Sequence, residues 1–289
     1  MTNSRQRLRA LQVPTEKRLR TLPIPLTIML IDTHTHIYCE EFDDDRDAVV
    51  QRAVDAGVEL MLLPAIDSAT TLRQHQLAEQ YPDHFRMMAG LHPTSVGENF
   101  EEELRLVKQQ LESTPDRYVG IGEIGLDLYW DTSRRAEQED VLMQQMQLAE
   151  QYNKPVALHI RNAYSEFFDL MKKINHEKYN GVMHCFSGTL DEALLGVEMG
   201  YYLGIGGVLT YKKSLLPEIV RQIPIERLLL ETDAPYLAPV PHRGRRNESA
   251  YIVNVAQMMA DIKGKSIEYI ADATSENARQ LFKLTTTHK

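Results

Sequence analysis

The chain has 289 residues, of which 43% are hydrophobic and 25% charged, a composition typical of a globular protein with one large domain or two smaller ones. Its formal net charge of -9 excludes a surface that is basic throughout, as in proteins that cling to nucleic acid or anionic membranes, although it allows a local basic patch. With two cysteines and no apolar run of the roughly 18 residues that a membrane helix needs, a disulfide framework and a membrane span are also excluded, and a cytoplasmic location is expected.

The first 28 residues differ in composition from the rest of the chain. The segment contains six basic residues but only one acidic residue, Glu16, and three prolines interrupt it. Such a segment is expected to be a flexible basic extension, with a targeting or nucleic-acid-contacting role as the alternative, and it lacks the apolar stretch of a secretory signal. The predicted division is an extension over 1–28, a folded domain over 29–284 and a short tail over 285–289.

Apolar strand-like segments then alternate with amphipathic helical segments. The predicted strands span residues 28–31, 60–66, 86–91, 118–123, 155–159, 181–184, 201–208 and 227–233. The predicted helices span residues 44–56, 70–80, 101–111, 133–152, 165–174, 190–199, 215–222, 250–262 and 266–282. Eight apolar strands, each followed by a helix, predict an α/β fold with a single (β/α)8 barrel, the TIM barrel. An open doubly wound sheet is the alternative, but no glycine-rich phosphate loop follows the first strand.

Two histidines follow the first predicted strand, in the run Ile31-Asp-Thr-His-Thr-His36. Alternate residues of a strand point to the same face, so His34 and His36 are expected to face the same way. Two neighbouring imidazoles can hold one metal ion through neutral ring nitrogens. On its own the pair is weak evidence, because two polar residues at a strand end explain it equally well.

Further candidate ligands occur at the ends of later strands. They are His92, Glu123, His159, His184 and Asp233. In a parallel barrel all these ends open on one face, which is where active sites of such enzymes lie. Histidines that merely fill the core would not be confined to that rim, so the pattern predicts a metal-dependent active site there.

The number of donors predicts two metal ions. Five or six nitrogen and oxygen donors exceed the needs of one tetrahedral zinc ion, whereas two ions about 3.5 to 4 Å apart would use them all. Glu123 is the expected bridging ligand, because the glycines beside it let a carboxylate approach a crowded centre. Such a centre lowers the pKa of a bound water, so hydrolysis is the expected reaction, with the metal left open among Zn, Mg and Mn.

Asp233 closes the predicted set. It can serve as a ligand, as the acceptor of the proton of the attacking water, or as both, and a buried ion pair is the alternative. Glu231 has the same alternation parity and is expected to support the ligands from behind. Cys185 has the opposite parity to His184, so it is expected to face the helix layer as a small buried hydrophobe.

Several motifs in this chain resemble those of the TatD family of metal-dependent deoxyribonucleases. They are Ile31-Asp-Thr-His-Thr-His36, Gly90-Leu-His-Pro93, Gly122-Glu-Ile-Gly-Leu-Asp127, Leu158-His-Ile-Arg161, His184-Cys-Phe-Ser-Gly188, Glu231-Thr-Asp-Ala-Pro-Tyr-Leu-Ala-Pro239 and Pro241-His-Arg-Gly-Arg-Arg-Asn-Glu248. The match runs from Met29 to about Leu284, and only the basic extension departs from it. The resemblance implies an amidohydrolase-like barrel with two divalent metal ions.

The resemblance also implies roles for individual residues. It implies one ion on His34, His36, Glu123 and Asp233, and a second ion on Glu123, His159 and His184. It places His92 and Arg161 where they meet a substrate phosphate. Removal of nucleotides from the 3′ end of DNA is the activity implied for the family, although some relatives are linked to other hydrolyses, including removal of D-amino acids from tRNA.

Nucleic-acid contacts are expected from three further groups. The guanidinium of Arg161 suits bidentate binding of a phosphate, with a plain surface arginine as the alternative. Arg243, Arg245 and Arg246 follow the last strand and can draw a nucleic acid backbone in, or can form salt bridges that pin their loop. Tyr129 and Trp130 can stack on a base, or can form a hydrophobic lid.

The predicted function is that of a metal-dependent hydrolase with Asp233 and Glu123 as catalytic residues. DNA, as single strands or 3′ ends, is the expected substrate, and neither a membrane nor an obligate protein partner is expected. One alternative is hydrolysis of another ester or amide at the same centre, in a small molecule or an aminoacyl-tRNA. A less favoured alternative is a non-catalytic nucleic-acid-binding protein with a structural metal, which needs only about four ligands.

Overall fold

A computed structural model of the chain describes residues 28–174 and 179–285. The predicted basic extension lies outside this range except for Ile28, which is buried, and the predicted tail lies outside it except for Thr285. The division of the chain at these two places therefore stays a prediction.

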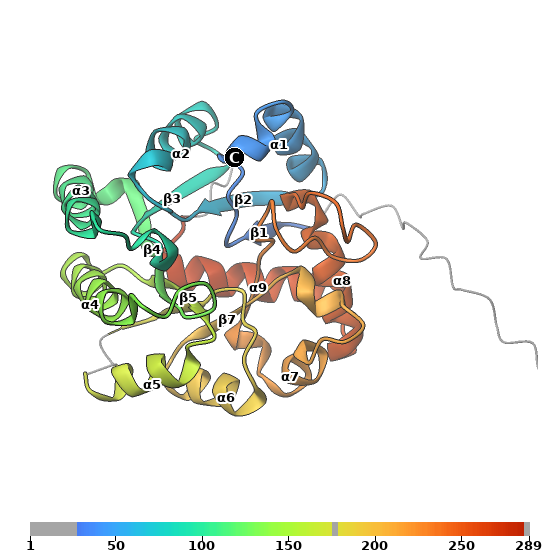
Figure 1. Ribbon diagram of the computed structural model, residues 1–289. Helices are drawn as coiled ribbons and strands as arrows, with labels where there is room; N and C mark the ends of the chain where they lie inside the picture. The colour runs from blue at the N-terminus through green and yellow to red at the C-terminus, as the bar shows by residue number, and fades with distance from the viewer. Residues whose placement is uncertain (1–27, 175–178, 286–289) are drawn as a thin grey trace, which may run out of the picture.

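Eight parallel strands form a nearly closed barrel within the described residues, in the order β1 to β8 (Figure 1). The strands are β1 (Leu30–Asp32), β2 (Val58–Leu63), β3 (Phe85–Ala89), β4 (Tyr118–Asp127), β5 (Val156–Arg161), β6 (Gly181–Met183), β7 (Tyr202–Ile205) and β8 (Leu228–Leu230). The ends of the sheet meet where Thr33 N–H donates to Leu230 O over 3.1 Å, and Thr35 bridges to Ala234 just beyond. The predicted (β/α)8 barrel is confirmed, and the open sheet is wrong.

The helices up to α8 surround the barrel on its outside, and α9 lies across one end of it (Figure 1). They are α1 (Arg46–Asp55), α2 (Ser68–Gln80), α3 (Phe100–Ser113), α4 (Arg135–Tyr152), α5 (Tyr164–Lys172), α6 (Leu190–Glu198), α7 (Leu216–Gln222), α8 (Ile252–Lys263) and α9 (Ile267–Phe282). Because helices cover the outer face and side chains fill the inside, the strands are apolar on both faces, as the sequence requires. None of the helices in the described part of the chain is both long and apolar enough to cross a membrane.

Local sequence determines where several helices begin and end. Asp67 precedes α2 and accepts from Thr70 N–H over 3.2 Å, while Thr189 precedes α6 and accepts from Glu192 N–H over 3.3 Å. Each therefore satisfies a backbone donor that the first helical turn leaves free. Gly264 follows α8 with φ of 63°, a left-handed conformation that ends the helix and that glycine adopts without strain.

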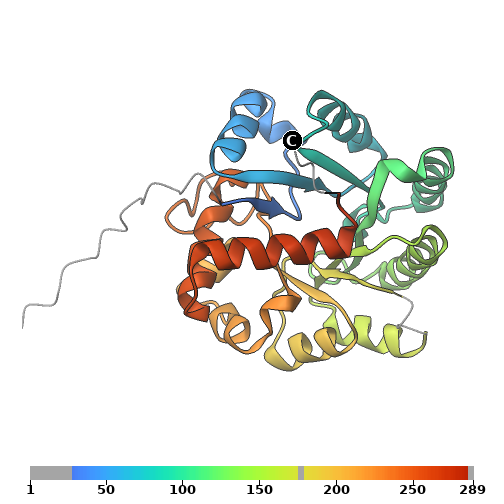
Figure 2. The same cartoon turned by 180° about the vertical axis from the view of Figure 1, so that it is seen from behind.

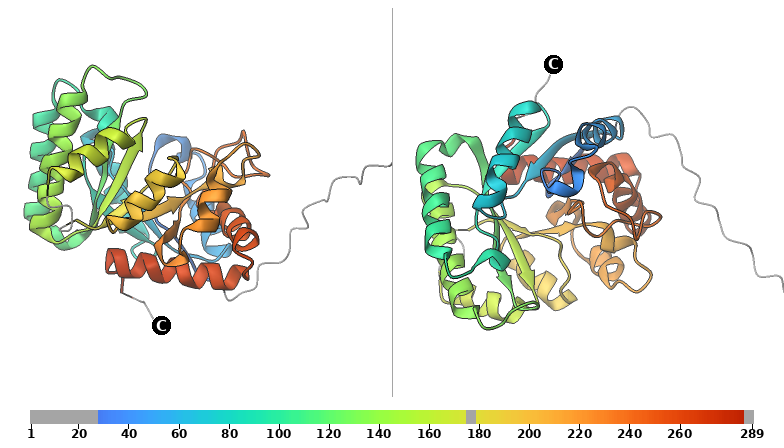
Figure 3. Two further views of the ribbon diagram at one scale, coloured as in Figure 1. Left: turned by 90° about the horizontal axis from the view of Figure 1, so that it is seen from below. Right: turned by 45° about the horizontal axis from the view of Figure 1, so that its top comes forward.

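The last helix, α9, closes the end of the barrel opposite the carboxyl ends of the strands, where the site is predicted (Figures 2 and 3). Its Phe282 and Leu281 pack among side chains inside the barrel, including Ile31 of β1 and Leu229 of β8. Asn277 donates to the carbonyl oxygen of Leu228 over 2.9 Å, where β8 begins. Burying a side chain the size of Phe282 contributes roughly 1.5 to 3 kcal/mol, so this plug stabilises the barrel while the other end stays open for chemistry.

All eight strands differ from their predicted bounds, and the differences in β4 and β8 move predicted site residues. β4 continues to Asp127, so Glu123 lies within the strand rather than at its end. β8 stops at Leu230, and Asp233 follows it with φ of 56°. β7 ends at Ile205, before a short 3-10 helix at Gly207–Thr210. These are places where strand alternation no longer gives the direction of a side chain.

The extension of β4 depends on Gly125, which lies against the backbone of β5. Its φ is 147°, and a Cβ added there would lie 1.9 Å from the carbonyl oxygen of His159. Only glycine combines this φ with so close an approach. The contact holds the residues after Glu123 against the strand that carries His159.

We expect Gly125→Ala to destabilise the protein by at least about 2 kcal/mol more than Gly200→Ala, because it adds overpacking to backbone strain. Gly200 is a matched control, since its φ of 97° is also positive but a Cβ there would meet nothing within 4 Å. Urea denaturation followed by circular dichroism measures both free energies of unfolding. Equal losses for the two variants would show that the contact with β5 is not the constraint.

Candidate metal centre

The predicted site residues come together at the carboxyl ends of the strands, around a cavity of about 680 Å³. Those that line the cavity are His36, His92, Glu123, His159, Arg161, His184 and Asp233. His34 lies behind them and is fully buried. The structure thus assembles every residue that the sequence singled out for this site, although nothing in the geometry alone assigns their roles.

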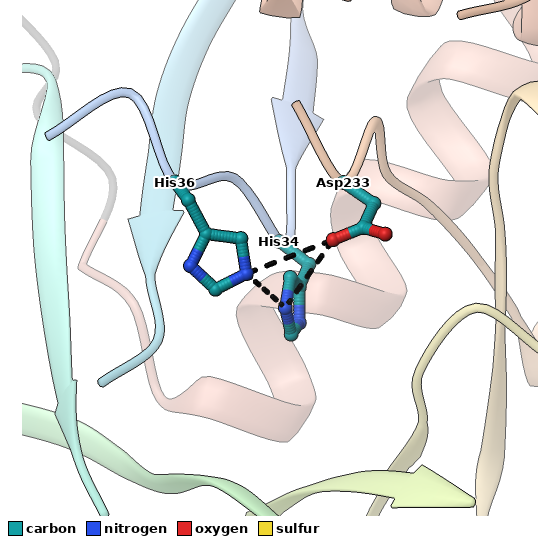
Figure 4. A group of neighbouring side chains, drawn as sticks. All are labelled: His34, His36 and Asp233. Atoms are coloured by element: carbon teal, nitrogen blue, oxygen red, sulfur yellow. Dashed lines mark hydrogen bonds and ion pairs between the residues drawn. The ribbon is translucent and has the colours of Figure 1, made fainter. Parts of the chain in front are cut away.

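The first donor set consists of His34, His36 and Asp233 (Figure 4). The Nε2 atoms of His34 and His36 are 3.2 Å apart, and both face Asp233 Oδ1, at 4.0 and 3.6 Å. Burial lowers the pKa of His34 well below its ordinary value, with the neighbouring His184 adding to the effect. Burial also raises the pKa of Asp233, to about 6, although His184 and His36 oppose the shift.

Glu123 lies between this set and a second one. Its Oε2 is 3.0 Å from Nε2 of His34 and 3.5 Å from Nε2 of His36. Its Oε1 is 2.8 Å from Nδ1 of His159, 3.3 Å from Nε2 of His92 and 3.4 Å from Nε2 of His184. Burial opposes ionisation of this carboxyl, but the surrounding imidazoles hold its pKa well below the ordinary value. The two oxygens of one carboxylate therefore face two separate groups of donors.

Hydrogen bonds behind the rings determine which nitrogens carry protons. Tyr38 donates to the carbonyl oxygen of Pro64 over 2.6 Å, so its oxygen accepts from Nδ1 of His36 over 2.9 Å. The Nε2 lone pair of His36 then faces the centre, as a metal ligand requires.

The same reasoning applies to the rings beside Glu123 Oε1. Nε2 of His159 lies 2.9 Å from Asp127 Oδ2, and Nδ1 of His184 lies 3.1 Å from Glu231 Oε1. The hydrogen bond to Asp127 holds the His159 proton on Nε2, and the charge of Glu231 favours a proton on Nδ1 of His184, so the inner nitrogen of each ring is left with its lone pair toward Glu123. Lone pairs and a carboxylate that converge at 2.8 to 3.4 Å repel unless protons or cations lie among them, so the donor arrangement fits metal ions.

His92 differs from the other rings. The backbone N–H of Thr94 donates to its Nδ1 over 3.1 Å, so the ring proton lies on Nε2, which faces Oε1 of Glu123 at 3.3 Å. Burial lowers the pKa of His92 from its ordinary value, which keeps the ring neutral with that single proton. His92 therefore presents a hydrogen-bond donor rather than a lone pair.

Three buried carboxylates hold this arrangement from behind. Glu231 was expected to support the ligands, and its Oε1 also accepts from Cys185 N–H over 2.5 Å. Asp127 supports His159, although the sequence gave no reason to select it beyond its place in a motif. Asp32 accepts from the hydroxyls of Thr232 and Ser249, each over 2.6 Å, and so ties β1 to the segment that carries Asp233.

The prediction for Cys185 is wrong. Its φ of 45° breaks the strand alternation after β6 ends at Met183, so the side chain lines the cavity instead of facing the helices. Its sulfur lies within 4.8 Å of possible ligand atoms of His184 and Asp233. The chain changes direction at the end of β6 and again at the positive φ of Cys185. Side-chain alternation along a strand cannot predict the outcome of two such changes.

Two arginines of the loop after β8 make contacts within the protein, which was the predicted alternative to binding a nucleic acid backbone. Arg246 forms two 2.8 Å contacts with the carboxylate of Asp45, and its guanidinium lies 4.5 Å from the ring centroid of Phe42. Arg243 lies over the ring of Tyr211, 4.4 Å from its centroid. Internal contacts thus pin this loop, at least at Arg246.

Comparison with known proteins places these motifs in a family. A family model described as TatD related DNase matches residues 31–283. The chain is 38% identical over 257 residues to an uncharacterized metal-dependent hydrolase, YabD of Bacillus subtilis, and the match covers 89% of this chain and 100% of YabD. It is 36% identical over 261 residues to a Pantoea vagans protein named 3'-5' ssDNA/RNA exonuclease TatD, covering 88% of this chain and 100% of that protein.

A solved structure shows the same fold. The crystal structure of YjjV, a TatD homologue from Escherichia coli K12, matches with a TM-score of 0.83 at 33% identity, covering 89% of this chain and 98% of that one. At this identity and coverage the similarity extends over the barrel and its site.

We expect Gly204→Ala to weaken metal binding by about 10- to 100-fold, the usual effect of disturbing a residue that orients a ligand. A Cβ at Gly204 would lie 2.2 Å from Glu231 Oε2, and Glu231 is fully buried, so its carboxylate must move away from His184. Gly206→Ala is the control, since its Cβ would meet nothing closer than 3.6 Å. Calorimetric titration of chelator-stripped protein with zinc measures both affinities, and equal values would contradict the role of Glu231.

Proposed function

Because this chain belongs to the TatD family of metal-dependent hydrolases, we propose that it is an exonuclease that removes nucleotides from the 3′ end of single-stranded DNA. The observation that carries the proposal is an arginine without an acidic partner beside the donor sets. Within the described residues no carboxylate pairs with Arg161, although the guanidinium lines the same cavity as Glu123 and Asp233. An arginine left free at a cluster of metal ligands suits a phosphate. The relatives named as exonucleases point to the same substrate.

The proposed ligand assignment follows the two oxygens of Glu123. One divalent ion is held by His34, His36, Glu123 and Asp233, and the second by Glu123, His159 and His184. When bound, two such ions lower the pKa of a water and offset the charge of the phosphate, whether they are Zn, Mg or Mn.

The chain's own residues bind and orient the substrate. Arg161 binds the non-bridging phosphate oxygens through its guanidinium fork. His92 donates the proton on Nε2 to the same phosphate, which agrees with the hydrogen bond that fixes its tautomer. The Asp233 side chain lines the cavity, is 14% exposed, and accepts the proton of the attacking water.

A second candidate keeps the same centre and takes another substrate. The pinning of Arg246 by Asp45 and the net charge of -9 leave little basic surface for a long nucleic acid, which favours a small ester or amide, or the acyl end of an aminoacyl-tRNA. A non-catalytic nucleic-acid-binding protein is not a candidate, because the chain belongs to a family of hydrolases.

We expect single-stranded DNA labelled at its 5′ end to shorten stepwise from the 3′ end when chelator-stripped protein is given Mg, Mn or Zn. Asp233→Asn should lower the rate at least about 100-fold, the contribution of a positioned proton acceptor. Asp83→Asn, an exposed acid away from the cavity, is the matched control and should leave the rate unchanged. Intact DNA in the presence of a fully metal-loaded wild-type protein would overturn the substrate and leave the esters and aminoacyl-tRNAs to be tried.

A further inference from the structure

Trp130 is a large aromatic side chain that the fold leaves in solvent. It is 70% exposed, although it lines the cavity of the candidate metal centre. A tryptophan in a protein core or interface usually buries roughly 150 to 250 Å² of surface. Trp130 therefore forgoes most of the stabilisation that burying this area would give. Exposed apolar surface at the rim of a pocket is typical of a binding site.

Arg161 is held beside Trp130 by aromatic rings. Its guanidinium carbon lies 4.0 Å from the ring centroid of Tyr129 and 5.2 Å from that of Trp130. A ring face attracts the cation without using its N–H donors, which stay available for phosphate oxygens. The two rings are nearly perpendicular, at 86°, so they hold the arginine in a corner.

A single carboxylate connects this corner to the proposed metal ligands. Oδ2 of Asp127 contacts Nε2 of His159 at 2.9 Å. Its Oδ1 accepts from the backbone N–H groups of Tyr129, over 3.0 Å, and Trp130, over 3.4 Å. The position of the Trp130 backbone is therefore fixed relative to the ring that faces Glu123. A loop that only covered the cavity would need no such link.

We propose that Trp130 is the stacking surface for the base of the nucleotide whose phosphate Arg161 binds. The inference rests on the proposed function, since it names the part of a nucleic acid that the same cavity takes. A phosphate held at Arg161 leaves the attached nucleoside beside the exposed ring, and every base has a face that can stack on indole.

This subsite has a consequence for substrate selection. A base within a duplex is already stacked and paired, so only an unpaired end delivers its base to Trp130 without loss. Stacking is also tolerant of sequence. The subsite therefore selects single-stranded ends over duplex ends, without a preference for one base.

The chain carries its own reporter of this contact, because Trp130 is its one tryptophan. Metal-loaded, full-length protein is titrated with deoxyadenosine 5′-monophosphate and, separately, with 2-deoxyribose 5-phosphate while indole fluorescence is recorded. We expect saturable quenching by the nucleotide and none by the sugar phosphate at the same concentrations. Equal quenching by both compounds, or none by either, overturns the proposal.

A second measurement uses cleavage of oligonucleotides with a normal or an abasic 3′-terminal nucleotide. Trp130→Ala should raise KM for the normal end by about five- to 100-fold, the range of one lost stacking contact, with little effect on the abasic end. Trp130→Phe should restore most of the difference. Tyr269→Ala is the matched control, because Tyr269 is 43% exposed and lies near Lys265 on a helix away from the cavity.

The two measurements separate the failure of this inference from the failure of the proposed function. A lid that excludes water would lower kcat for normal and abasic ends alike, and that result overturns the stacking role while leaving the nuclease intact. Saturable quenching by the nucleotide without any cleavage of DNA would support the subsite and overturn the proposed function instead.

Discussion

The buried carboxylate of Glu123 is the constraint on which the rest of this site depends. A carboxylate removed from water is strongly destabilising unless positive charge or hydrogen-bond donors surround it. Here five imidazole rings approach it, three toward Oε1 and two toward Oε2. The five rings lie at the carboxyl ends of four strands, because His34 and His36 both follow β1, while His92 follows β3, His159 lies in β5 and His184 follows β6. A protein that failed to close the barrel between β1 and β8 could not assemble the first donor set, because His34 and His36 follow β1 while Asp233 follows β8.

The supporting carboxylates explain why these rings have one orientation. Asp127 holds the ring proton of His159 on the side away from Glu123, and Glu231 faces Nδ1 of His184 at 3.1 Å. Asp32 holds the end of β1 to the residues after β8. The glycines at 204 and 125 provide the space, because a side chain at either would collide with Glu231 or with the backbone of β5. Orientation of the donors is thus distributed over residues that would not themselves touch a metal or substrate.

The barrel could be predicted from the sequence, because apolar strands that alternate with helices favour a parallel (β/α)8 topology. The donors after the strands were predicted for the same reason, since the carboxyl ends of parallel strands meet on one face. The direction of Cys185 could not be predicted, because a positive φ after a short strand breaks the alternation on which the prediction depended. Nor could the partners of Asp32 and Arg246, which lie about 200 residues away along the chain and are brought near only by closure of the barrel.

The most direct test of this account is the number of metal ions that the protein binds through Glu123. Chelator-stripped wild-type protein, Glu123→Gln and the surface control Glu98→Gln would be titrated with zinc or manganese, with bound metal counted by elemental analysis after desalting. We expect two ions per chain in the wild type and the control, and loss of at least one in Glu123→Gln, because the amide presents an N–H donor to one donor set. A wild type that binds a single ion, or a Glu123→Gln variant that keeps two with unchanged affinity, would contradict the bridging role of this carboxylate.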